Sequence, residues 1–286
     1  MSIDRRKFFK VAGITGLSFM GLNTSGAPVS EEEDTEFYGV LYDSNICIGC
    51  GACEKACAQA HDLPEPEDKP EVGVVRKTSI NQRCALNSYE TSEGEVYVRN
   101  QCMHCNEPAC AAACLTKAMY KTKEGPVIWR ENKCMGCRYC MVSCPFDVPK
   151  FDYNSTNPKI QKCDMCYDRI KNGEIPVCVE TCGDALFFGT RRELITEARR
   201  RIAETPEMYV EKIYGETVAG GTGYLYLAPV PHNELGFTRP LQNSSYPSLT
   251  KGFLYSVPSV FVLVPTLLLG IHEATKSKIN KNENHD

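Results

Sequence analysis

The sequence predicts an α+β fold built from repeated units, each with a strand, a turn, a loop of cysteines and a short helix, followed by one long apolar helix. Three observations predict this fold. Sixteen of the seventeen cysteines fall into four groups of four. Short apolar runs typical of strands precede three of these groups. The twenty residues from Gly252 to Ile271 contain no charged side chain.

The third cysteine group is the most specific motif in the sequence. It runs from Cys134 to Pro145 with the spacing C-x2-C-x2-C-x3-C-P. This spacing is typical of bacterial iron–sulfur proteins, in which three cysteines hold one cluster and the fourth ligates another. Gly136 lies between the first two cysteines, where it allows the backbone to pass close to the inorganic core. The group therefore predicts a partner group elsewhere in the chain.

The other three groups have related spacings. The first lacks only the proline, whereas the second and fourth lengthen one gap to four and eleven residues. Their members are Cys47, Cys50, Cys53 and Cys57; Cys102, Cys105, Cys110 and Cys114; and Cys163, Cys166, Cys178 and Cys182. The four groups predict two ferredoxin-like dicluster modules in one four-cluster domain. Cys84 stands outside them and is predicted to be a buried or partly exposed free thiol.

Zinc and disulfides are the alternatives to iron–sulfur clusters. Zinc sites take their four ligands as two separated pairs, a geometry that a compact run of four cysteines lacks. Disulfides are possible in an exported protein, although repeated x2 spacing suits a metal better than many bridges. A zinc-stabilised interaction module without a redox role therefore stays the distant alternative. A net charge of -4 gives no general basic field, so no nucleic-acid partner is expected.

Residues 1–30 are predicted to be a twin-arginine signal segment. Arg5 and Arg6 precede a mildly apolar stretch from Val11 to Leu22, which is the arrangement of such export signals. An ordinary basic and hydrophobic N-terminus is the alternative. Because clusters are assembled inside the cell, an exported cluster protein must cross the membrane already folded. The twin-arginine route performs that task, so a periplasmic location is predicted.

Residues 36–250 are predicted to form the cluster domain. Strands are expected from Phe37, at Val96–Val98 and at Val127–Trp129, each leading into a cysteine group. Turn residues 122–126 join residues 118–121 to the last of these strands, which predicts a hairpin.

A strand at residues 185–188 and then a helix are predicted after the fourth cysteine group. Thr190 and Glu193 stand in capping-box register at the start of that helix. The expected apolar face of the helix consists of Leu194, Ile195, Ala198 and Ile202. Residues 224–227 are expected to form either a strand or a docking edge.

Residues 252–271 are predicted to be a single transmembrane helix, because twenty uncharged residues match the hydrocarbon thickness of a bilayer. Pro258 and Pro265 are tolerated better in a membrane helix than in a soluble one. A buried core helix is the alternative. Three lysines follow the segment and one precedes it, so residues 272–286 are predicted to be a cytoplasmic tail. The cluster domain would then lie on the periplasmic face of the membrane.

The region from about Phe37 to Phe188 resembles the four-cluster iron–sulfur subunits of the dimethyl-sulfoxide-reductase B family. The four cysteine groups, two of them with a lengthened gap, carry this resemblance. The signal segment, the stretch Gln161–Cys166, the segment Gly220–Pro231 and the C-terminal span resemble the branch that serves nickel–iron hydrogenases.

The resemblance implies crossed ligation of four 4Fe–4S clusters and a second module, residues 95–158, inserted in the first. The implied ligand sets are Cys47, Cys50, Cys53 and Cys182; Cys163, Cys166, Cys178 and Cys57; Cys102, Cys105, Cys110 and Cys144; and Cys134, Cys137, Cys140 and Cys114. Every first-position ligand is cysteine, which argues against a 3Fe–4S variant. Proline follows only Cys144, because Ala58, Leu115 and Gly183 occupy the other three places.

The resemblance also implies a non-catalytic electron-transfer subunit. Its partners would be the small and large subunits of a periplasmic hydrogenase, an integral membrane quinone-reactive subunit and the membrane itself. The alternative catalytic partner is a molybdopterin oxidoreductase of the polysulfide, nitrite-linked or formate type. No catalytic residue is predicted. His104, between Cys102 and Cys105, is interpreted as a packed loop residue in preference to one that tunes a cluster.

Overall fold

The computed structural model describes residues 36–282 except 67, 156–157 and 238–240. Residues 35–249 form one compact unit, and residues 250–286 belong to a second unit with the N-terminal residues. Each unit is therefore described by itself. The predicted twin-arginine segment lies outside the described residues.

A three-stranded sheet organises the compact unit. Its central strand β1 (Tyr38–Asp43) pairs antiparallel with β8 (Leu186–Thr190) and parallel with β9 (Tyr224–Leu227). The strands predicted from Phe37 and at residues 185–188 are confirmed within one or two residues. Residues 224–227 are a paired strand whose side chains are all buried, so their interpretation as a docking edge is wrong.

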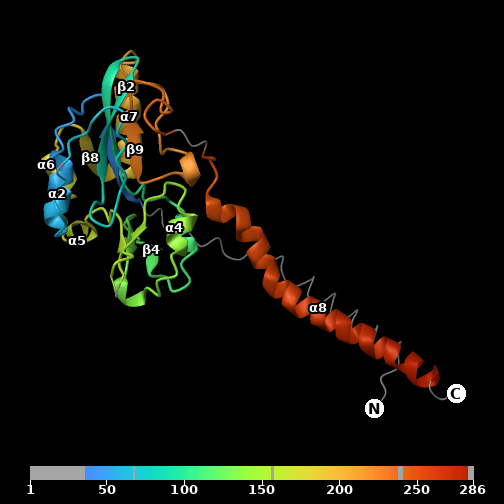
Figure 1. Cartoon of the computed structure of the whole chain (residues 1–286). Helices are drawn as coiled ribbons and strands as arrows, with labels where there is room; N and C mark the ends of the chain where they lie inside the picture. Colours follow the sequence, from blue (N-terminus) through green and yellow to red (C-terminus); the bar gives the residue numbers. More distant parts are fainter. Residues whose placement is uncertain (1–35, 67, 156–157, 238–240, 283–286) are drawn as a thin grey trace. The chain divides into compact units, whose positions relative to one another are not determined.

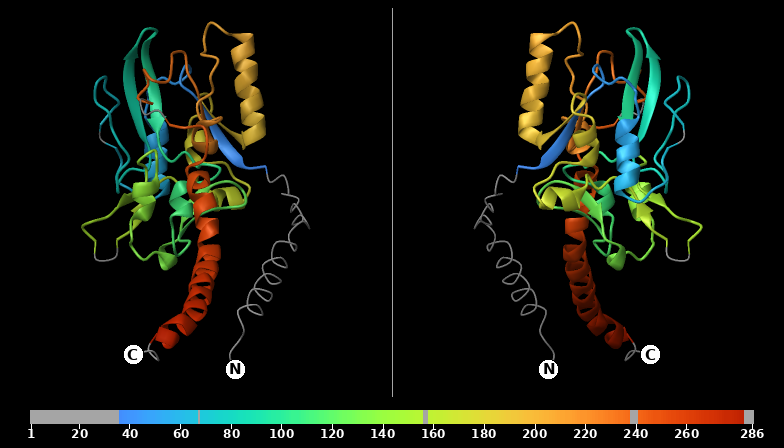
Figure 2. Two further views of the ribbon diagram at one scale, coloured as in Figure 1. Left: turned by 90° about the vertical axis from the view of Figure 1, so that its right-hand side faces the viewer. Right: turned by 90° about the vertical axis from the view of Figure 1, so that its left-hand side faces the viewer.

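The two faces of this sheet pack against different partners, because side chains alternate along a strand. Leu41, Leu225 and Leu227 pack against α7 (Arg191–Glu204). The alternate positions, including Tyr42 and Tyr226, pack against the hairpin of β2 (Ala85–Thr91) and β3 (Gly94–Asn100). Figure 2 shows this hairpin and α7 on opposite sides of the sheet. The predicted capping box of Thr190 and Glu193 and the predicted apolar face of α7 are both confirmed.

Short helices carry the cysteines in two parts of the unit. Figure 1 shows α2, α5 and α6 on one side of the domain, and α4 and β4 in the part below the sheet. The first part contains α2 (Ala52–Ala60), α5 (Tyr167–Lys171) and α6 (Val177–Thr181). The second contains α3 (Ala109–Ala112), α4 (Tyr139–Ser143), the 3-10 turn η1 (Glu131–Lys133), the hairpin of β4 (Met119–Lys121) and β5 (Val127–Trp129), and the pair of β6 (Lys150–Phe151) and β7 (Ile160–Gln161). The β4–β5 hairpin confirms the predicted one, whereas β2 was not predicted.

At Gly39 the backbone of β1 passes very close to the backbone of Gly223. A Cβ atom at Gly39 would lie 2.4 Å from the backbone oxygen of Gly223, and that oxygen accepts the Val40 N–H bond at 2.8 Å. Gly39→Ala should therefore destabilise the fold by about 2–3 kcal/mol and lower its melting temperature by roughly 5–10 °C, measured by circular dichroism. Gly183→Ala is the control, because a Cβ there meets no atom within 4 Å. Equal melting temperatures for both variants would contradict the prediction.

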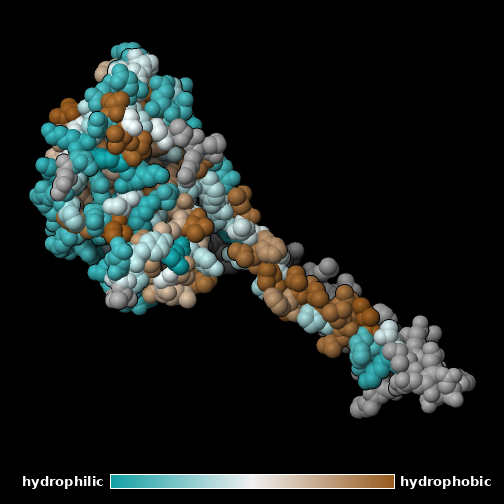
Figure 3. All heavy atoms as spheres, in the orientation of Figure 1, coloured by the Kyte–Doolittle hydropathy of each residue, from teal (hydrophilic) through white to brown (hydrophobic). Residues whose placement is uncertain are grey.

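The last helix, α8 (Tyr246–Asn282), contains the predicted apolar span. Residues Tyr246–Glu273 are long and apolar enough to cross a membrane, and none of their apolar window is buried. Hydrophobic residues predominate on the face of the helix that Figure 3 shows, before the polar end of the helix. Pro258 and Pro265 lie within the helix without ending it.

Candidate metal centre

One backbone turn is repeated in all four cysteine groups. The residue before the second cysteine has a positive φ in every group: 71° at Gly49, 47° at His104, 71° at Gly136 and 60° at Met165. Glycine adopts this conformation freely, whereas it costs an L-residue roughly 1–2 kcal/mol. Such strain at equivalent positions is typical of functional loops. A left-handed turn also directs backbone N–H groups into a concave site, and Met165 N–H donates to Cys163 Sγ at 3.3 Å.

The structure brings the first cysteine group together with the fourth. Burial, together with the charges of Cys182 and Cys50, raises the pKa of Cys47. Burial and the nearby Cys178 raise the pKa of Cys166 to about 11. Cys47 and Cys182 also pack against the core cluster that contains Cys53 and Cys178, so cysteines more than a hundred residues apart in the sequence come together where α2 packs on α6.

The fourth cysteine of the first group faces members of the fourth group. Cys57 lies near Cys163, and a hydrogen bond with Cys84, burial and Cys163 all raise the pKa of Cys57. Cys163 lies near Cys178, and burial is the main cause that raises its pKa. The neighbours of Cys57 are thus in the fourth group and at Cys84.

The structure brings the second group together with the third in the same way. Burial and the charges of Cys102 and Cys144 raise the pKa of Cys105 to about 12, and they raise that of Cys110 as well. Burial and the charges of Cys134, Cys114 and Cys137 raise the pKa of Cys140 to about 11. Cys144, the fourth cysteine of the third group, therefore lies near cysteines of the second group, and Cys114 of the second group lies near Cys140 of the third.

The donor set fits an iron–sulfur cofactor. All seventeen cysteines lie in the described part of the chain and all are free thiols. Thiols gathered at one place repel one another as thiolates, so a cationic metal centre is needed to hold them in that form. The mutual repulsion of these thiolates contributes to the raised pKa values of Cys105, Cys140 and Cys166.

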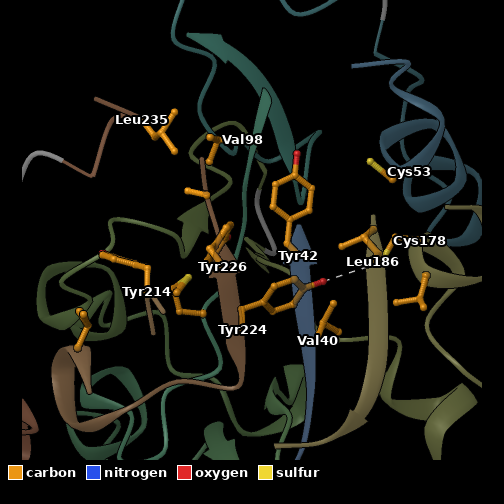
Figure 4. Close-up of a cluster of buried hydrophobic side chains, with 14 of the residues drawn as sticks. Val40, Tyr42, Cys53, Val98, Cys178, Leu186, Tyr214, Tyr224, Tyr226 and Leu235 are labelled. Carbon is orange, nitrogen blue, oxygen red and sulfur yellow. Dashed lines mark hydrogen bonds between the residues drawn. The ribbon is translucent and has the colours of Figure 1, made fainter. Parts of the chain in front are cut away.

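Buried cations surround the cysteines, and the sequence analysis missed them. Arg99 is 1% exposed, and its Nη1 donates to the Tyr224 hydroxyl at 2.8 Å. That hydroxyl lies 3.9 Å from Cys178 Sγ, which is the dashed contact in Figure 4. Figure 4 also shows Tyr42, Tyr224 and Tyr226 on the face of the sheet that meets Cys53 and Cys178. Arginines in a strand carry no sequence signal for such a role.

His104 is fully buried and accepts the backbone N–H bond of Val127 at its Nδ1, 2.8 Å away. This contact supports its interpretation as a packed loop residue. Burial and then the charges of Lys162 and Lys121 lower its pKa well below the usual range, so the ring is neutral. Cys84 is buried as predicted, and its thiol lies beside Cys57. The hydrogen bond with Cys57 lowers the pKa of Cys84 to about 6.

Glu54 is a buried carboxylate between two cysteines of α2, and it too was missed by the sequence analysis. It is 3% exposed and accepts bonds from Arg76 Nη2 at 3.0 Å and from the Leu86 N–H at 2.6 Å. It also accepts a bond from Gln82 Nε2 at 3.1 Å. These bonds tie the loop that carries Cys84 to the helix that carries Cys53 and Cys57.

Glu54→Gln should destabilise the protein by about 3 kcal/mol, because Arg76 would lose its counter-charge in a buried site. Thermal unfolding and iron retention should report the loss together, since Glu54 directly follows the proposed ligand Cys53 in α2. Glu65→Gln removes an exposed carboxylate near the same helix and should change the melting temperature little. A Glu54→Gln protein as stable as Glu65→Gln would contradict this role.

Comparison with known proteins identifies the cysteine region. Residues 94–191 match the model of a 4Fe-4S dicluster domain, and residues 38–59 match that of a 4Fe-4S binding domain. A protein of Nitratidesulfovibrio vulgaris is 40% identical over 96% of this chain and 78% of its own length. The hydrogenase-2 operon protein HybA of Escherichia coli O157:H7 is 30% identical over 99% of this chain and 98% of its own length.

A third relative covers a smaller share of this chain. The B subunit of the anaerobic dimethyl sulfoxide reductase of Haemophilus influenzae is 38% identical over 57% of this chain and 78% of its own length. The two matched family models cover all four cysteine groups between them. The chain is therefore a member of the family of ferredoxin-type 4Fe–4S iron–sulfur subunits of oxidoreductase complexes that includes HybA and the B subunit of dimethyl sulfoxide reductase.

Proposed function

We propose that this protein is a non-catalytic electron-transfer subunit that holds four 4Fe–4S clusters in two dicluster modules, the second (residues 95–158) inserted in the first. The observation that supports the proposal is that cysteines of the first group lie near those of the fourth, and cysteines of the second group near those of the third. The proposed ligand sets, numbered in this order, are set 1 (Cys47, Cys50, Cys53, Cys182), set 2 (Cys57, Cys163, Cys166, Cys178), set 3 (Cys102, Cys105, Cys110, Cys144) and set 4 (Cys114, Cys134, Cys137, Cys140).

The four ligand sets lie in a continuous order through the domain. Cys53 of set 1 lies near Cys178 of set 2, and Cys163 of set 2 lies near Cys102 of set 3. Sets 3 and 4 are joined by α3 and α4, which pack on each other. When bound, each cluster accepts and releases one electron. The protein's own contribution is to hold neighbouring sets close together in this order.

Each end of this order reaches the surface. Cys50 of set 1 and Cys137 of set 4 are exposed. Apolar side chains are exposed around them, with Ile48 next to set 1 and Leu115, Met135 and Val142 of α4 next to set 4. Exposed apolar residues around a site are typical of a surface that meets another protein. The two ends therefore suit electron entry from one partner and exit to another.

The proposed partners are a periplasmic catalytic subunit and an integral membrane quinone-reactive subunit. The full-length likeness to HybA favours the small and large subunits of a nickel–iron hydrogenase as the catalytic partner. Residues 1–30 would be the twin-arginine signal, residues 36–250 the cluster domain, residues 252–271 the transmembrane helix and residues 272–286 the cytoplasmic tail. The domain would then lie on the periplasmic face of the membrane. A molybdopterin oxidoreductase is the second candidate partner, favoured by the likeness to the B subunit of dimethyl sulfoxide reductase.

Metal analysis of anaerobically purified protein tests the proposal. Four 4Fe–4S clusters require about sixteen irons per chain and give broad visible absorbance. A colourless protein with stoichiometric zinc would instead identify the zinc-stabilised interaction module. Nickel or molybdenum in a co-purified large subunit distinguishes the two candidate partners.

A further inference from the structure

Lys162 occupies the junction between ligand sets 2 and 3. We propose that Lys162 is a positioning residue for electron transfer, whose cation raises the reduction potentials of the clusters in both of these sets. The inference rests on the proposed ligand sets. One side chain would then raise the reduction potentials of both clusters between which an electron passes from one module to the other.

The contacts of Lys162 fix its ammonium group in place. The residue is 4% exposed and follows β7 directly. Its Nζ donates to the backbone oxygen of Cys163 at 2.7 Å and to that of Val127. The same Nζ lies 3.8 Å from Cys102 Sγ. One ammonium group therefore touches a ligand thiol of set 3 and the backbone of a ligand of set 2.

The groups around the Lys162 side chain determine which negative charges its ammonium group meets. The three acceptors around Nζ, which are two backbone oxygens and the Cys102 sulfur, match the three N–H donors of an ammonium group. The carboxylate of Asp164 follows two residues later in the sequence. Asp164 is itself engaged by Arg83 Nη1 at 2.6 Å and by His61 Nε2 at 3.6 Å. The counter-charges left for Lys162 are therefore the cysteine ligands.

A fixed buried cation favours the more negative state of a redox centre beside it. Reduction adds one negative charge to a cluster, so Lys162 should stabilise the reduced form at both neighbouring sets. Lys121 provides a comparison within the same domain. Its Nζ donates to the backbone oxygens of His104, Cys105 and Gly125, which places it beside set 3 alone.

The test is a redox titration of the four clusters, followed by electron paramagnetic resonance, in the full-length protein. In Lys162→Gln the reduction equilibrium constant of the clusters in sets 2 and 3 should fall about tenfold each, which is about 59 mV for a one-electron couple. Lys162→Arg should restore both potentials, and Lys121→Gln should shift the cluster of set 3 alone. The clusters of sets 1 and 4 should keep their potentials in every variant.

Two outcomes would overturn the inference while leaving the proposed function intact. One is a Lys162→Gln protein with four clusters whose potentials in sets 2 and 3 are unchanged. The other is a shift in only one of those two. If the proposed function itself is wrong, the wild-type protein will not contain the roughly sixteen irons per chain that four clusters require.

A second measurement needs no substitution at Lys162. Protein labelled with ¹⁵N-lysine in the Lys121→Gln background should show hyperfine coupling between a lysine nitrogen and the reduced cluster of set 3. That coupling is expected because Lys162 Nζ lies 3.8 Å from Cys102 Sγ. Lack of such coupling would overturn the contact on which the inference stands, even if Lys162→Gln failed to take up clusters.

Discussion

Cys144→Ser should remove the cluster of set 3, although Cys144 belongs to the third cysteine run. The structure places Cys144 near Cys105 and Cys110. Burial is the main cause that raises the pKa values of these two cysteines, and the charge of Cys144 raises them further. Burial likewise is the main cause that raises the pKa of Cys144 itself. Loss of one ligand should lower the iron content from about sixteen to about twelve per chain.

Spectroscopy of matched variants distinguishes crossed from uncrossed ligation. Cys134→Ser should remove the signal of a different cluster, that of set 4, because Cys134 lies near Cys140 and Cys140 lies near Cys114 and Cys137. Cys84→Ser is the control, since it removes a buried cysteine outside the four sets and should keep all four signals. If Cys144→Ser and Cys134→Ser lost the same signal, the crossed sets would be wrong.

The cysteine spacing predicted which loops would carry the site, because x2 spacing demands a tight turn wherever it occurs. Gly136 was recognised as the residue that permits such a turn. His104 and Met165 make the same left-handed turn without glycine, and only the backbone angles reveal it. A motif therefore predicted the turn where glycine was present, but not where tertiary packing imposes it on another residue.

The charges around the cysteines were not predictable in the same way. Lys162 belongs to the stretch that carried the family resemblance, yet its spacing gave no reason to bury a cation there. Its burial depends on β5, whose Val127 oxygen it meets thirty-five residues earlier in the sequence. Glu54 depends similarly on Arg76 and Leu86, which the unpredicted approach of β2 brings to α2. Contacts between distant segments decide both roles, and periodicity within one segment does not report them.

Ending the protein after Leu249 should move it from the membrane fraction to the soluble fraction. The shortened protein loses the apolar window of α8, none of which is buried in the structure. A spanning helix makes attachment effectively irreversible, so high salt should release almost none of the full-length protein. No proposed ligand lies beyond Cys182, and the Ser245 hydroxyl still donates to Glu107, so the shortened domain should stay folded and brown.

Fractionation in cells that lack the partner subunits makes this test specific, because no complex can then hold the domain at the membrane. Full-length protein should sediment with membranes, and a reporter fused after Asp286 should be active only if it works in the cytoplasm. Electron delivery to quinone should fall in the shortened protein although its clusters are intact, because the anchor no longer raises the local concentration of the domain at its membrane partner. A shortened protein that still sediments with membranes would show that residues 1–30 are the anchor and that α8 is not required for attachment.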